Sequence, residues 1–144
     1  MPETSTDLLD SCIEKVEASY EYMLAYAAQG RKTEPAAGSG ADGPSIRDFL
    51  QDLIWGIEHI SEGFMQAMQP GDQTFENIQA FNSTLTADAA SALTVVKIVY
   101  DAPTLSSQLI DNLNASSHLR CLLTDIFVLD EVQKIYRKTA ATGA

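Results

Sequence analysis

Carboxylates and histidines at helical spacing are the side chains of this chain best suited to chemistry. Glu58, His59 and Glu62 lie within five residues, and Glu17 and Glu21 lie four positions apart, which is about one turn of a helix. Carboxylate and imidazole ligands that converge from several helices can bind a divalent metal. A metal centre of this kind would draw on Glu17, Glu21, Glu58, Glu62, Asp88 and His118.

Ferritin-like di-iron bundles place a glutamate three residues before each of two metal-binding histidines. In this chain Gly56 stands three residues before His59, and Ala115 stands three residues before His118. The resemblance to ferritin-like bundles therefore ends at the number of helices. A metal-binding or oxidoreductase bundle with a degenerate carboxylate site is our alternative hypothesis, and we expect no cofactor.

Asp88 is the acidic residue closest to an apolar helical stripe, because it falls between Leu85 and Ala92. His118 and Asp125 share a partly apolar stripe further along the chain. Buried polar groups nearly always have hydrogen-bond partners. Without a metal we therefore expect Asp88 to be a boundary residue bonded to a neighbouring serine or threonine.

Cysteine chemistry has weak support. Cys121 follows His118 by three residues, which places a thiol and an imidazole on one side of a helix. No third group that could orient the pair is evident. Cys12 and Cys121 each have apolar residues near them in the sequence, so we expect two reduced thiols in the core and no catalytic residue.

Aromatic and acidic side chains favour a binding function. Trp55 lies opposite the main apolar stripe of its segment, and exposed aromatics with an acidic rim are typical of protein interfaces. The residues that we expect to bind a protein partner are Trp55, His59, Glu62, Glu14, Glu17 and Glu21.

Four apolar stripes with helical period must position these residues. They cover Leu8–Gly30, Ile46–Gln69, Asp72–Asp101 and Leu105–Lys138, with a Gly-, Ala- and Pro-rich linker at 31–44. The pattern predicts an all-α protein, an antiparallel four-helix bundle that forms one domain over 1–144. Poor helix formers predict a kink or break in the last helix near 114–117, and we expect the tail 139–144 to fray.

Small residues indicate close packing of the first two helices. Gly56 and Gly63 lie seven residues apart, as do Ser11, Ala18 and Ala25, so we expect these two stripes to face each other. At the start of the second helix, Ser45 and Asp48 have the spacing of a capping box.

The balance of charge limits the choice of partners. The 144-residue chain carries a net charge of −11, which disfavours nucleic acids and anionic membranes. No segment has the apolar length of a membrane-spanning helix, and the first residues are polar and acidic, so we expect a cytoplasmic protein. The second apolar flank of the last helix, at Ile110 and Phe127, favours a homodimer.

We therefore expect a small acidic helical protein that acts by protein–protein interaction and self-associates, with a partner that is basic. A third hypothesis is an apolar ligand in the core beside Met23, Met65 and Met68, although methionines more often simply fill a core.

Overall fold

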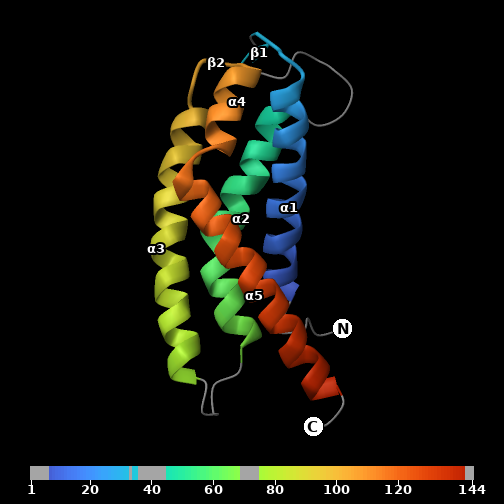
Figure 1. The fold of residues 1–144 in the computed structure, drawn as a ribbon, viewed down its shortest axis with the longest axis vertical. Coiled ribbons are helices and arrows are strands. Elements are labelled where there is room, and N and C mark those ends of the chain that lie inside the picture. Colours follow the sequence, from blue (N-terminus) through green and yellow to red (C-terminus); the bar gives the residue numbers. More distant parts are fainter. Residues whose placement is uncertain (1–6, 33, 36–44, 69–74, 142–144) are drawn as a thin grey trace.

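The computed structural model describes residues 7–32, 34–35, 45–68 and 75–141. This part of the chain is all-α, with five helices packed in contact. The helices are α1 (Asp7–Ala28), α2 (Ile46–Ala67), α3 (Phe75–Tyr100), α4 (Ser107–Asn114) and α5 (Ser117–Ala141). Figure 1 shows α1, α2 and α3 running along the long axis, whereas α5 crosses them at an angle.

Two glycines bring α1 and α2 close together. A Cβ atom at Gly63 would lie 3.0 Å from the backbone N and Cα of Leu9. At Gly56 it would lie 2.8 Å from a methyl carbon of Val16 and 3.1 Å from the carbonyl oxygen of Cys12. The predicted glycine stripe is confirmed, because only a residue without a Cβ fits at this separation.

The matching stripe on α1 was predicted wrongly. Ser11, Ala18 and Ala25 are exposed, whereas the α1 backbone that meets the glycines belongs to Leu9 and Cys12. Side-chain size was a poor guide here, because the glycines contact the backbone of α1.

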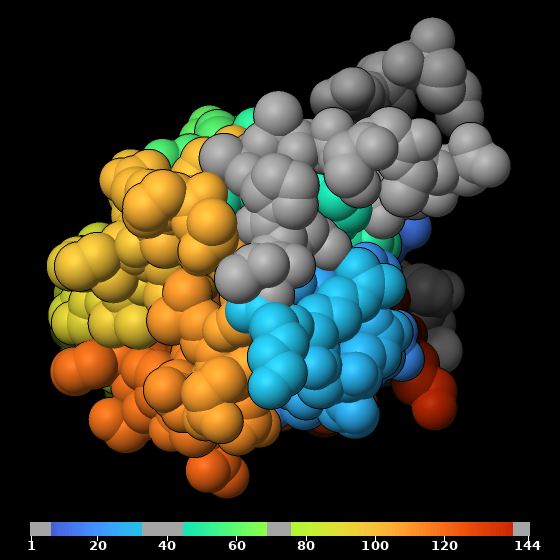
Figure 2. Space-filling view, turned by 90° about the horizontal axis from the view of Figure 1, so that it is seen from above, coloured from blue at the N-terminus to red at the C-terminus, as the bar shows by residue number. Residues whose placement is uncertain are grey.

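Polar bonds close the end of the molecule where α1 and α3 finish. Ser107 donates its hydroxyl to the Tyr26 carbonyl oxygen at 2.6 Å and accepts from the Arg31 amide at 2.8 Å. Asn114 donates from Nδ2 to the Met23 carbonyl oxygen at 3.1 Å. Figure 2 looks onto this end and shows the orange atoms of the α4 region against the light-blue atoms of the end of α1. We call this the α4 end.

Arg47 of α2 completes the α4 end. Its guanidinium donates to the carbonyl oxygens of Tyr100 and Ala102, the latter at 2.6 Å. Carbonyls in the last turn of a helix have no partner within the helix. Arg47 therefore caps α3 from a different helix.

The last helical segment is interrupted where the sequence predicts it. α4 ends at Asn114 and α5 begins at Ser117, which confirms the predicted break. The two parts pack differently, since α4 lies mainly against α1 and α5 mainly against α3. The break therefore redirects the chain from one neighbour to another.

Other local expectations have mixed outcomes. The capping box is confirmed, since Ser45 accepts from the Asp48 amide and Asp48 accepts from the Ser45 amide. A short strand pair was not predicted: β1 (Glu34–Pro35) runs antiparallel to β2 (Thr104–Leu105). α5 continues to Ala141, beyond the predicted start of the tail, and 142–144 lie outside the described residues. Most of the predicted linker, 36–44, also lies outside them.

No helix in the described ranges combines the length and the apolar composition that crossing a membrane requires.

Candidate functional site

Trp55 lies half-buried on the solvent side of α2, between its own helix and α1. Its ring stacks on His59 with the ring centroids 4.4 Å apart, and Lys15 Nζ of α1 lies 5.6 Å from the ring centroid. Lys15 also pairs with Asp52 at 3.5 Å. Trp55 is thus partly covered by side chains of its own chain, and the rest of its surface is exposed to solvent.

Glu62 is exposed one turn after His59 and accepts a hydrogen bond from Gln66 at 3.1 Å. Its negative charge also acts on the buried Cys12 thiol of α1. Burial, and secondarily this charge, raises the pKa of Cys12 to about 12. Cys12 is therefore an unreactive core thiol, as predicted, whereas Cys121 is exposed and that prediction is wrong.

The acidic stripe of α1 faces a different groove. Glu14, Glu17 and Glu21 line a cavity of about 370 Å³ between α1 and α5. Two cations of α5 approach it: Lys134 lines the cavity, and Arg137 pairs with Asp10 of α1 at 2.6 Å. The stripe is thus partly neutralised within the molecule.

The six predicted partner-binding residues are divided between α2 and α1. Trp55, His59 and Glu62 lie on α2, with Lys15 of α1 over the Trp55 ring, whereas Glu17 and Glu21 line the groove between α1 and α5. Glu14 belongs to the α1–α5 groove and also lines the smaller one beside Lys15.

The residues of the metal hypothesis are not brought together. Glu58 pairs with Lys97 of α3 at 3.4 Å, and Glu17 and Glu21 line the groove against α5. His118 is exposed on α5. Within the described ranges, no three side chains of His, Cys, Asp and Glu are grouped in a way that could hold a metal ion.

Two carboxyl groups from different helices do meet. Asp88 of α3 and Asp125 of α5 line an open cavity of about 430 Å³. Burial, a hydrogen bond with Asp88 and the negative charge of Asp88 together raise the pKa of Asp125 to about 7. The sequence pointed to both residues, but it predicted a serine or threonine partner for Asp88, not a second carboxyl group.

The outer face of α5 carries apolar side chains that the core does not use. Phe127, Val128 and Ile135 are 50 %, 49 % and 62 % exposed. Their positions, eight residues from first to last, place them on one side of the helix. The predicted flank is thus half right, because Phe127 is exposed whereas Ile110 is fully buried.

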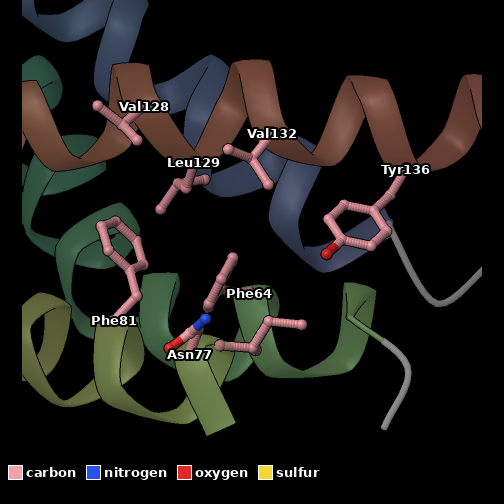
Figure 3. A pocket seen from close by; sticks show the side chains of 8 residues that line it. Phe64, Asn77, Phe81, Val128, Leu129, Val132 and Tyr136 are labelled. Atoms are coloured by element: carbon pink, nitrogen blue, oxygen red, sulfur yellow. The ribbon is translucent and has the colours of Figure 1, made fainter. Parts of the chain in front are cut away.

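An apolar cavity of about 320 Å³ opens beside this face. Figure 3 shows Leu129, Val132 and Tyr136 directed from α5 toward Phe64 of α2 and Phe81 of α3. Sequence periodicity did not indicate this cavity, because it results from the angle at which α5 leaves the other helices. The methionines proposed to line a ligand site are not among its lining residues, and Met23 and Met68 are buried in the core.

No protein-family model, curated protein or solved structure matches this chain.

Proposed function

We propose that this protein acts by binding protein surfaces and that it forms a homodimer through the outer face of α5. The observation that carries the proposal is the exposure of Phe127, Val128 and Ile135 on one side of the helix, beside an apolar cavity. Contiguous exposed apolar side chains mark interaction sites in many globular proteins.

Charge favours a second copy of the chain as the occupant. The whole chain carries −11, so two copies repel each other over most of their surfaces. α5 is different: it contains four Lys and Arg residues against three Asp and Glu residues, a net charge of +1. Two α5 helices can therefore approach with less repulsion than any acidic part of the surface.

The pattern along α5 also suits a two-fold axis. In a symmetric dimer the same patch must complement itself. If two α5 helices pair antiparallel about a point near Glu131, Val128 of one copy falls opposite Ile135 of the other. Glu131 of each copy then lies near Lys134 of its partner, so apolar contacts and charges are matched together.

The arrangement of helices is part of this proposal. We propose that the molecule is a four-helix bundle in which α4 and α5 share the fourth position. The tilt of α5 away from α1 and α2 is what leaves its outer face available to a second copy.

A basic partner is a second proposal, supported by the groove between α1 and α5. Its carboxylates come from both helices: Asp10, Glu14, Glu17, Glu21 and Asp130. Lys134 is the one cation among the residues that line it. A basic peptide in this groove would compete with Lys134 and Arg137 of α5 for the same carboxylates.

Sedimentation velocity over a range of protein concentrations tests the homodimer. We expect the wild type to dimerise and the double variant Phe127→Glu/Ile135→Glu to remain monomeric, with an unchanged circular dichroism spectrum. Leu24→Glu is the matched control, because Leu24 is 47 % exposed on α1, away from this face. A monomeric wild type, or a double variant that dimerises as well as the Leu24 control, would overturn the proposal.

A further inference from the structure

The contact between α3 and α5 includes a polar pair, formed by Asp88 and Asp125. Both side chains are partly buried, and both line the cavity of about 430 Å³ between the two helices. α5 makes its main contact with the rest of the molecule through α3. The chemistry of this pair therefore bears directly on how firmly α5 is held.

A shared proton can bridge the two carboxyl groups. The Oδ2 atom of Asp125 is buried, and no hydrogen-bond donor among the described residues reaches it. The nearby Thr124 hydroxyl donates to the Arg120 carbonyl oxygen at 2.9 Å and is thus already engaged. Two ionised carboxylates have acceptors only, so they can bond to each other only when one of them carries a proton.

The other charged or titratable side chains that line the cavity belong to α5. They are Arg120 and Cys121, both exposed, whereas α3 contributes Asp88 alone. The connection between α4 and α5 contributes Ala115, and the start of α5 contributes Ser117, neither of which carries a charge. No charged group of α1 or α2 lines the cavity, so repulsion between the two carboxylates is opposed mainly by one solvated guanidinium.

We propose that Asp88 and Asp125 form a proton-operated latch that holds α5 against α3. The latch is closed when the two carboxyl groups share a proton. When both are ionised, the shared hydrogen bond is replaced by repulsion between like charges, and α5 separates from α3 more readily. The latch is independent of whether α5 binds a second copy.

The pH range follows from the raised pKa. The pKa of Asp125 lies at about 7 in the folded protein, compared with 3.8 for an ordinary aspartate. The folded state thus binds the proton more tightly than the unfolded state, and stability is lost as pH rises from about 4 through 7. Linkage then makes the opening equilibrium about tenfold more favourable at pH 8 than at pH 6.

Hydrogen exchange measured by mass spectrometry at pH 6, 7 and 8, corrected for the intrinsic pH dependence of exchange, tests the latch. We expect the protection of α5 amides in the wild type to fall about tenfold between pH 6 and pH 8, while the protection of α1 and α2 changes little. In Asp125→Asn the amide replaces the shared proton as donor to Asp88, so protection of α5 should be nearly constant over this range and higher than in the wild type at pH 8.

Two further variants keep the test decisive. Asp88→Asn should reduce the pH dependence without abolishing it, because burial still raises the pKa of Asp125 when the charge of Asp88 is gone. Combining the two substitutions should give the nearly constant protection of Asp125→Asn alone. Asp111→Asn, which removes an exposed carboxylate of α4 outside the pair, should keep the wild-type slope. The same slope in the wild type and in both asparagine variants would overturn the latch, and so would a slope shared equally by α1 and α2.

Discussion

The two ends of this molecule are built in opposite ways. At the α4 end, buried side chains such as Ser107 and Asn114 bond to backbone atoms of α1, and Arg47 caps α3. At the opposite end, which we call the α5 end, apolar side chains surround an open cavity and Ile135 is 62 % exposed. Buried hydrogen bonds to backbone atoms favour one geometry, whereas an open apolar surface gains by acquiring a partner. The contrast therefore favours the α5 end as the location of the binding surface that we propose.

The largest expected difference is chemical and concerns the two thiols. The pKa of Cys12, raised to about 12 by burial and by Glu62, lowers its thiolate fraction near pH 8 by about 1,000-fold relative to the ordinary thiol. Cys121 is exposed on α5. A thiol reagent should therefore modify one cysteine of the native protein quickly, and the second only after denaturant is added. Rapid modification of both in native protein, or loss of the fast phase in Cys12→Ser instead of Cys121→Ser, would contradict this assignment.

The next largest effect is expected where α1 and α2 meet. Gly63→Val should lower the free energy of unfolding by about 3 kcal/mol, because the new side chain collides with the backbone of Leu9 and helices cannot move apart without cost. Ala18→Val on the exposed face of α1 is the control, with a change within about 0.5 kcal/mol. Urea unfolding of both variants gives the comparison. Similar stabilities would mean that the helices are not in close contact.

Removing the Ser107 hydroxyl at the α4 end should lower the free energy of unfolding by less than Gly63→Val does, but by a measurable amount. Ser107→Ala removes the donor to the Tyr26 carbonyl oxygen and the acceptor for the Arg31 amide. We expect a loss of about 2 kcal/mol in urea unfolding, since one buried carbonyl oxygen and one partly buried amide each lose a partner. Ser91→Ala on the exposed face of α3 should change stability by less than about 0.5 kcal/mol, and equal effects at the two serines would remove the contrast between the ends.

The smallest effect on stability is expected at the α5 end, although Ile135 is larger than Ser107 and apolar. Ile135→Ser should change the free energy of unfolding of the monomer by less than about 0.5 kcal/mol, because most of the side chain is already in water. Thermal unfolding at low concentration, where a dimer is dissociated, measures this value. A loss as large as that of Ser107→Ala would mean that α5 is packed more tightly than its exposure indicates.

Periodicity and composition anticipated the parts of the fold that depend on local sequence. The helical segments, the capping box at Ser45 and the break after Asn114 each follow from residue preferences within a few positions. The role of Asn114 did not follow. Its position in a run of poor helix formers predicted a break, but its hydrogen bond to the Met23 carbonyl oxygen joins residues 91 positions apart.

The candidate site was less accessible to sequence reasoning for the same reason. Phe127 was identified as surplus apolar surface, but the angle of α5 that exposes it depends on the packing of α4 and α5 against different neighbours. The sequence analysis singled out Asp88 and Asp125 separately. Their places in the sequence did not indicate that the two side chains meet between α3 and α5. Properties of single helices were predictable, whereas contacts that depend on the tilt of a helix were not.

The cap that Arg47 provides has a consequence for the order in which the protein folds. The carbonyl groups of Tyr100 and Ala102 lie more than 50 positions along the chain from the guanidinium that binds them. The carboxyl end of α3 therefore remains uncapped until α2 has formed. Until then, the orientation of the chain that follows α3 is not fixed. Contacts between segments close in sequence cost the least loop entropy, so we expect the α1–α2 hairpin to form early, α3 to be capped on it, and α4 to dock afterwards. α5, with its main contact on α3, would be the last helix to join and the first to leave.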